Sequence, residues 1–94
     1  MAAFDDRLEA LRERFIVRSR TDRIMLIKAL AADDRTELQR IAHSLAGAGG
    51  LFGHPEISDS GQRLEDALDE ATTEDIQEAA RELLRRLEAL DQPG

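Results

Sequence analysis

Residues 40–53 read Arg40-Ile41-Ala42-His43-Ser44-Leu45-Ala46-Gly47-Ala48-Gly49-Gly50-Leu51-Phe52-Gly53. Apolar residues recur at helical spacing through this stretch and just before it, at Leu38, Ile41, Leu45, Ala48 and Phe52. The spacing predicts an amphipathic helix with its apolar side against a core and His43 on the solvent side. An exposed imidazole among small residues is accessible to a partner.

Small residues surround the histidine on its own face of the predicted helix. Positions three, four and seven after His43 are Ala46, Gly47 and Gly50, and these positions share one face. Each interior glycine costs about 1 kcal/mol relative to alanine, so three glycines weaken the helix by roughly 2–3 kcal/mol. We interpret Gly49, beside the apolar stripe, as a packing glycine, and Gly47 as one that admits a second protein.

Length and composition indicate one small domain over residues 1–94. The chain has no cysteine, a net charge of -7 and only three aromatic residues, all phenylalanine. A binding site for nucleic acid needs a basic face and stacking rings, and an acidic membrane surface also needs basic residues. We therefore expect neither partner. With no cysteine, no signal peptide and no apolar span, a cytoplasmic location is expected.

Four further segments carry apolar residues at helical spacing, and no segment alternates with a period of two. The polar residues 18–22 between the first two segments are compatible either with a break or with an exposed turn of one long helix. The apolar positions are Phe4, Leu8, Leu11 and Phe15 in residues 3–18; Ile24, Leu26, Ile27 and Leu30 in residues 20–32; Ile57, Gly61, Leu64, Leu68 and Ala71 after Pro55; and Ile76, Ala80, Leu83, Leu87 and Leu90 near the end.

Helix boundaries are marked by capping residues. Asp34 and Glu37 resemble a capping box before the His43 helix, and Gly53 followed by Pro55 ends it and begins the next. Thr72 and Thr73 precede the acidic first turn of the last helix. Short connections make neighbouring helices antiparallel. The sequence therefore predicts an all-α fold, an antiparallel four-helix bundle in which the first segment is either a member or a cap.

Most catalytic motifs are absent from the chain. There is no phosphate-binding glycine loop ending in Lys-Ser or Lys-Thr, no nucleophile elbow and no His-Glu-x-x-His motif. His43 and His54 would lie roughly 16 Å apart along a continuous helix, too far to share one metal ion. We therefore expect no metal site and interpret His54 as a loop or capping residue.

His43 remains as a nucleophile or phosphoryl carrier. A neutral imidazole has an unprotonated ring nitrogen near pH 7, and its other nitrogen needs an acceptor that holds the ring. Gln62 and Glu65, three residues apart on the Pro55 helix, are the candidates. The alternative for Glu65 is an ordinary surface glutamate that forms a salt bridge.

These residues carry a family resemblance. Leu38-x-x-Ile41-Ala42-His43-Ser44-Leu45-Ala46-Gly47, the later Gly53 and Arg63-Leu64-Glu65 resemble histidine-containing phosphotransfer (HPt) domains over about residues 35–70. The resemblance implies that His43 carries the phosphoryl group and that Gly47 admits the partner. It also implies that Gln62 and Glu65 occupy positions that hydrogen-bond the imidazole or the phosphoryl group in some members.

One position departs from the family pattern. Members usually have lysine three residues after the histidine, where this chain has Ala46. The resemblance implies that the partner receiver domain supplies an acidic pocket, a lysine and Mg²⁺, so this chain needs no cofactor of its own. Arg40, one turn before His43, is a substitute cation, or else a solvated arginine paired with nearby carboxylates.

The sequence thus predicts a phosphorelay intermediate and not an enzyme with kinase activity of its own. Expected partners are a response-regulator receiver domain and a sensor or hybrid histidine kinase. We expect the chain itself to be a monomer. The predicted docking surface comprises Ser44, Gly47 and Gly50. Ile16, Val17 and Met25 are apolar candidates for the same surface; the alternative is that they belong to the core. A non-phosphorylated adaptor or inhibitor remains an alternative because of Ala46. The dimerisation bundle of a histidine kinase is disfavoured, because Ser44 replaces the expected acidic residue.

Overall fold

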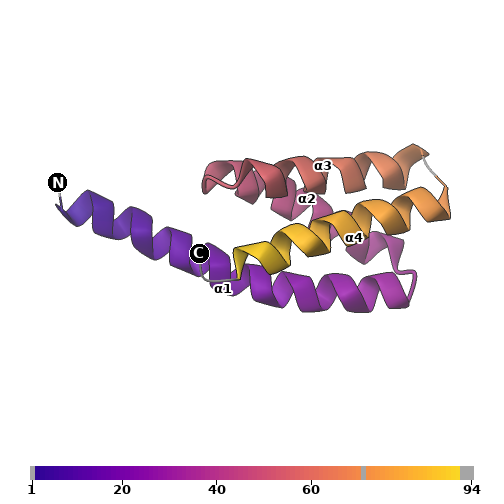
Figure 1. The fold of residues 1–94 in the computed structure, drawn as a ribbon, viewed down its shortest axis with the longest axis horizontal. Helices are drawn as coiled ribbons and strands as arrows, with labels where there is room; N and C mark the ends of the chain where they lie inside the picture. Colours follow the sequence, from indigo (N-terminus) through magenta and orange to yellow (C-terminus); the bar gives the residue numbers. More distant parts are fainter. Residues whose placement is uncertain (1, 71, 92–94) are drawn as a thin grey trace.

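The computed structural model describes the backbone of residues 2–70 and 72–91, and side chains from residue 6 onward within these ranges. Four helices form there and no strand: α1 (Ala2–Ala31), α2 (Arg35–Leu51), α3 (Pro55–Glu70) and α4 (Thr73–Leu90). Each helix packs against its two neighbours in a ring, α1 on α2, α2 on α3, α3 on α4 and α4 on α1 (Figure 1). The predicted all-α four-helix bundle is confirmed.

The first two apolar segments of the sequence are one continuous helix. At 1.5 Å per residue α1 is about 45 Å long, whereas the other helices are about 24–27 Å. Its N-terminal half therefore extends beyond the bundle (Figure 1). The polar residues at 18–22 do not break it. Within this stretch the buried Ser19 hydroxyl donates a hydrogen bond to the Ile16 carbonyl at 2.6 Å, so its burial leaves no unpaired donor.

The predicted apolar stripe of α1 is only partly buried. Phe15 is 2% exposed, but Leu11 is 41% exposed and Leu8 is half-buried, because no other helix reaches this part of α1. Ile24 and Ile27, which the sequence grouped with the core residue Leu26, are about half exposed. They lie on the sides of α1 away from the bundle interior. The side chain of Phe4 and all of Ala71 lie outside the described residues.

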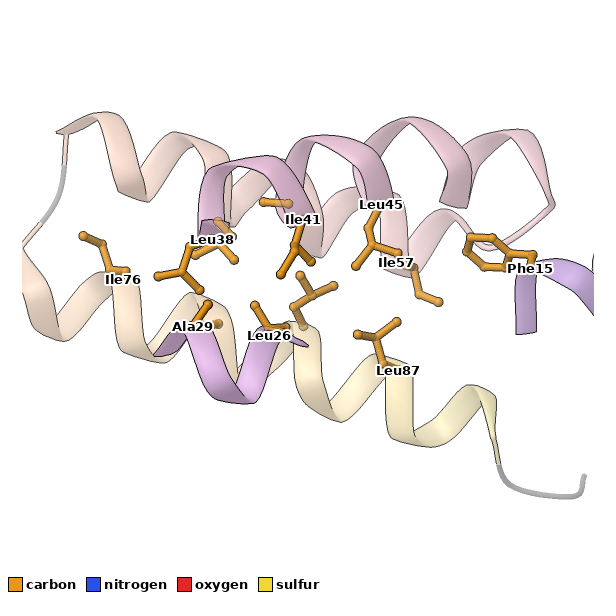
Figure 2. Packing of buried hydrophobic residues seen from close by; sticks show 13 residues of the cluster. Phe15, Leu26, Ala29, Leu38, Ile41, Leu45, Ile57, Ile76 and Leu87 are labelled. Atoms are coloured by element: carbon orange, nitrogen blue, oxygen red, sulfur yellow. The ribbon is translucent and has the colours of Figure 1, made fainter. Parts of the chain in front are cut away.

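The core runs through the middle of the four helices. Figure 2 shows its side chains converging between the ribbons, with Phe15 at one end and Ile76 at the other. The fully buried aliphatic side chains come from all four helices: Leu26, Leu38, Ile41, Leu45, Ile57, Leu64, Leu83 and Leu87. Leu68 and Leu90 are half-buried against this cluster.

The helix caps follow the sequence pattern. Asp34 accepts a hydrogen bond from the Glu37 amide at 3.1 Å, and Thr72 accepts one from the Asp75 amide at 3.2 Å. Gly53 adopts φ +81°, a left-handed conformation that glycine accommodates without strain. The chain then turns directly into α3, which places α2 and α3 antiparallel to each other.

Two glycines bring the α2 and α3 backbones close together. A Cβ at Gly61 would lie 2.9 Å from both the Ala42 carbonyl oxygen and the Ala46 amide nitrogen. A Cβ at Gly49 would lie 2.7 Å from the Ser58 amide nitrogen, which confirms the predicted packing role. These contacts flank His43 on α2, so the residues that follow Gly61 on α3 lie beside the histidine.

Candidate functional site

His43 projects from the middle of α2 into solvent, with 79% of its side chain exposed. Its Nδ1 atom lies 3.0 Å from Oε2 of Glu65 on α3. The Glu65 side chain is only 15% exposed, so its carboxylate is held between the helices and is directed at the imidazole. A carboxylate only accepts hydrogen bonds, so Nδ1 carries the proton in this contact. In the neutral ring, Nε2 then keeps its lone pair and is the accessible nitrogen.

The position of Glu65 follows from the close approach at Gly61. Glu65 lies one helical turn after Gly61, and Ala42 and Ala46, which meet Gly61, flank His43 in the sequence. Residues one turn apart share a helix face. The glycine contact therefore determines the separation between the carboxylate and the imidazole.

Gln62 does not take part in this contact. Its amide nitrogen donates a hydrogen bond to Oδ1 of Asp66 at 3.1 Å, and the residue is exposed on α3. The sequence placed Gln62 and Glu65 together beside the imidazole, but in the structure only Glu65 is hydrogen-bonded to it. The bond to Asp66 uses one of the two N–H groups of the amide, so the second N–H and the carbonyl oxygen can still bind a partner.

Arg40 lies one turn before His43 but is directed at an acidic neighbour. Its guanidinium donates to both carboxylate oxygens of Glu37, at 3.0 and 2.5 Å. This hydrogen bonding lowers the pKa of Glu37 and raises that of Arg40. Both side chains lie at the surface, so the ion pair contributes little to stability. In this arrangement the guanidinium is engaged by Glu37 rather than directed at His43.

A different arginine reaches the residue next to His43. Arg18 of α1 donates a hydrogen bond to the Ser44 hydroxyl, and its Nε lies 3.4 Å from Oδ2 of Asp22. Sequence reasoning missed this contact, because it treated residues 18–22 only as a break or turn. Helical spacing would have placed Arg18 and Asp22 one turn apart, but no local pattern identifies Ser44 as the partner across the helix pair.

Asp22 is the buried anion beneath this arginine. The residue is 8% exposed, and Oδ2 has no hydrogen-bond donor among the described residues. Burial raises the pKa of Asp22, and the positive charges of Arg18 and Arg40 oppose that effect. The charges of the two arginines thus offset part of the cost of burying this carboxylate.

The surface beyond His43 is open. A Cβ at Gly47 would meet nothing within 4 Å, and one at the exposed Gly50 would meet only the Ser58 side chain, at 3.5 Å. Ala46 is half-buried, and its carbonyl accepts a hydrogen bond from the Ser58 hydroxyl at 2.5 Å. Nothing bulky therefore follows the imidazole along this face of α2.

The apolar docking candidates on α1 differ in exposure. Ile16 and Met25 are half-buried, and Met25 packs against the core. Val17 is 59% exposed. Of the three, only Val17 offers a largely free apolar side chain.

His54 belongs to the packing at the α2–α3 connection. Its ring stacks on Phe15 at a centroid distance of 5.4 Å, and its Nδ1 lies 3.6 Å from the Glu56 carboxylate. It immediately precedes Pro55, the first residue of α3. Within the described residues, no group of three or more potential ligand side chains is arranged to hold a metal ion.

The helical fold agrees with a comparison against known families. Residues 10–93 match the family model of the Hpt domain. No curated protein and no solved structure matches the chain. In the described part of the chain, no helix combines the length and the apolarity needed to cross a membrane. The match covers all but the first helix turns and the last residue, and the chain belongs to the Hpt domain family, whose members are phosphocarrier modules of two-component signalling.

Proposed function

We propose that this chain is a phosphorelay intermediate in which His43 is the phosphoryl carrier. The observation that supports this role is the contact between Nδ1 of His43 and Glu65, which leaves Nε2 exposed. An imidazole held in this way is already oriented for attack, so little ordering is needed when a donor docks.

The transfer step is an in-line displacement at phosphorus. The Nε2 lone pair forms the N–P bond while the P–O bond to the aspartate of a phosphorylated receiver domain breaks, and that aspartate leaves as a carboxylate. The imidazole then bears a positive charge with its proton on Nδ1, and the Glu65 carboxylate at 3.0 Å stabilises this charge. Transfer to a second receiver reverses the same steps.

In our proposal the receiver domain supplies the acidic pocket, the lysine and the Mg²⁺ of this reaction. The bundle contributes an oriented nucleophile and an open approach over Gly47, where no neighbouring atom lies within 4 Å of a Cβ position. Charge stabilisation at phosphorus then comes mainly from the partner. The carrier has no kinase activity of its own, and its partners are receiver domains and histidine kinases in the cytoplasm.

The chain has only two histidines, which makes the carrier easy to identify. Labelled phosphoramidate should add one phosphoryl group that is lost in acid and retained in base. The group should be absent in His43→Gln and present in the matched variant His54→Gln. His43→Gln should retain its thermal stability within about 0.5 kcal/mol, because the side chain is exposed.

Receiver domains then test the relay itself. Purified phosphorylated protein is mixed with isolated receiver domains and Mg²⁺, and the label should move to a receiver aspartate. If the chain is an adaptor or inhibitor, it binds a receiver without ever gaining label from it. Label on His43→Gln would show that another residue is the carrier.

A further inference from the structure

A phosphoryl group on His43 would add negative charge to a site that already contains a carboxylate. The group carries about 1.5–2 negative charges near neutral pH, and Glu65 contacts the same imidazole. Arginine and lysine side chains are the groups that bind phosphoryl oxygens most strongly. Residues 44–51, the part of α2 that follows the histidine, contain no basic residue. A cation supplied by this chain therefore comes from earlier in α2 or from another helix.

The basic residue nearest to His43 along α2 is already paired. The Arg40 guanidinium donates to both carboxylate oxygens of Glu37, at 3.0 and 2.5 Å. A move of Arg40 to a phosphoryl group would break a two-point contact between opposite charges. The new contact would replace one anion by another, so the exchange would gain little.

Arg18 reaches the site from α1 and is held more loosely on its outer side. It donates a hydrogen bond to the Ser44 hydroxyl, and its Nε forms an ion pair with Oδ2 of Asp22 at 3.4 Å. Asp22 is only 8% exposed, so this carboxylate holds the Nε side of the guanidinium from inside the bundle. The outer contact is with a neutral hydroxyl, which a charged phosphoryl oxygen would outcompete. A guanidinium has five N–H groups, so these two contacts leave others for a further acceptor.

The surface between Ser44 and His43 is uncovered. A helical side chain lies over the turn that precedes its own Cα, so a side chain at position 47 would cover this surface. Gly47 has no side chain, and a Cβ there would meet nothing within 4 Å. The Cα atoms of Ser44 and His43 are about 3.8 Å apart across one peptide bond. No side chain of the following turn therefore separates the Arg18 guanidinium from a group bound to the imidazole.

We propose that Arg18 binds the phosphoryl group on His43. The inference rests on the proposed function, because it concerns the phosphorylated form of this histidine. Asp22 keeps its contact with Nε, and a terminal nitrogen of Arg18 moves from the Ser44 hydroxyl to a phosphoryl oxygen. Arg18 then stabilises the negative phosphoryl oxygens from the α1 side, while Glu65 stabilises the protonated Nδ1 from the α3 side.

A contact with Arg18 has a measurable effect on the phosphoryl group. Charged side chains at and beside the site come from three helices: Arg18 and Asp22 from α1, Glu37 and Arg40 from α2, and Glu65 and Asp66 from α3. The carboxylates favour the protonated phosphoryl group and raise its pKa, whereas the arginines favour the doubly charged form and lower its pKa. The proposal therefore predicts that Arg18 lowers the pKa of the phosphoryl group.

Phosphorus NMR of the phosphorylated protein measures this pKa. Protein labelled by phosphoramidate is titrated between about pH 9 and about pH 5.5, a range that includes the second ionisation of a phosphoryl group. Arg18→Gln should raise the pKa of the phosphoryl group by about 0.5–1, because it removes a positive charge at a site open to water. Arg18→Lys keeps the charge and should stay close to the wild-type value. A purely structural role of Arg18 would leave the phosphoryl pKa unchanged in both variants.

Two other arginines provide the controls. Arg14 is exposed on α1 one turn before Arg18, and Arg14→Gln makes the same change in net charge. It should move the phosphoryl pKa by less than about 0.2, since a more distant exposed charge is screened. Arg40→Gln combined with Glu37→Gln removes the neighbouring ion pair at constant net charge, and it should also have the smaller effect. An effect as large as that of Arg18→Gln in either control overturns the proposal.

The guanidinium signals of Arg18 give a direct test. On phosphorylation, its side-chain N–H signals should shift and exchange more slowly with water, because a charged acceptor now holds them. The signals of Arg14 should stay the same. A wild type that gains no label on His43 contradicts the proposed function, and this inference with it. If the wild type is labelled but the Arg18 signals do not change, or Arg18→Gln leaves the phosphoryl pKa unchanged, only the role of Arg18 is overturned.

Discussion

Oε2 of Glu65 lies 3.0 Å from Nδ1 of His43. This contact joins a mostly buried carboxylate to a mostly exposed imidazole. The burial of one partner holds the carboxylate in place, and the exposure of the other leaves Nε2 open. The pair therefore combines a rigid support with an accessible nucleophile, which is the arrangement that a phosphoryl carrier needs.

The first prediction concerns this support. Glu65→Ala should slow labelling of His43 by phosphoramidate by about tenfold or more, since a hydrogen bond to a charged group contributes about 1.5–3 kcal/mol. Glu65→Gln should lie between alanine and wild type, because its carbonyl oxygen still accepts from Nδ1 but carries no charge. Initial rates measured by mass spectrometry provide the comparison.

Two neighbours on α3 serve as controls for the Glu65 variants. Asp66→Ala removes an adjacent exposed carboxylate that is paired with Gln62, and it should change the rate by less than about twofold. Gln62→Ala should also have a smaller effect than Glu65→Ala. Equal labelling rates for wild type and Glu65→Ala would make Glu65 a surface residue without a role in transfer.

The second prediction separates two glycines on either side of the site. Gly47→Ala should stabilise the protein by up to about 1 kcal/mol, because its Cβ meets nothing and alanine is the better helix former. Gly61→Ala should destabilise it by about 1–3 kcal/mol, because its Cβ would lie 2.9 Å from backbone atoms of α2. Urea unfolding of both variants measures the difference.

Gly61→Ala should also disturb the chemistry. Separating α2 from α3 moves Glu65 away from His43. The rate of labelling should therefore fall by more than the fraction of unfolded protein accounts for. A Gly61→Ala variant as stable and as reactive as wild type would contradict the close packing of the two helices.

The sequence predicted those parts of the structure that depend on local signals. Asp34, Thr72 and Gly53 mark helix ends by hydrogen bonds and backbone conformation within a few residues, and they could be recognised without knowledge of the fold. The exposure of His43 followed from the spacing of its apolar neighbours. Glu65 could be chosen as a candidate because its helix had to lie beside α2.

Features that depend on the relative placement of helices could not be predicted. The helix α1 continues through residues 18–22 because this stretch packs against other helices: Ser19 and Asp22 are buried. The contact between Arg18 and Ser44 depends on how α1 lies against α2. Ile24 is exposed because only two helices cover α1, and its apolar character alone suggested a core position.

The third prediction concerns stability and pH at Asp22. Burial raises the pKa of Asp22 in the folded protein, so the folded state holds this proton more tightly than the unfolded chain does. Ionised Asp22 therefore lowers the free energy of unfolding at pH values above its folded-state pKa. As the pH falls toward the ordinary pKa of aspartate, Asp22 becomes protonated in the folded protein and this loss of stability disappears. Asp22→Asn should be more stable than wild type by on the order of 1 kcal/mol near neutral pH.

The difference in the free energy of unfolding between Asp22→Asn and wild type should become smaller as the pH falls. Unfolding in urea at about pH 7 and about pH 4 gives the two values, and subtracting the variants cancels the titration of the other carboxylates. A wild type that is more stable than Asp22→Asn near neutral pH would show that the Arg18 ion pair outweighs the burial of the carboxylate.

The last prediction distinguishes access of a protein from the chemistry of the imidazole. Gly47→Leu should fold, because the position is open, but a long helical side chain points back over the preceding turn and would cover His43. A receiver must bring its aspartate within bonding distance through phosphorus, so a displacement of about 1 Å can cost a hundredfold in rate. Transfer from a phosphorylated receiver should therefore fall steeply, whereas labelling by the small donor phosphoramidate should fall much less. Gly47→Ala, which adds only a methyl group, is the control and should retain most of both activities. If Gly47→Leu slows both donors equally, the side chain acts on the imidazole itself; if it slows neither, no receiver approaches His43 over Gly47.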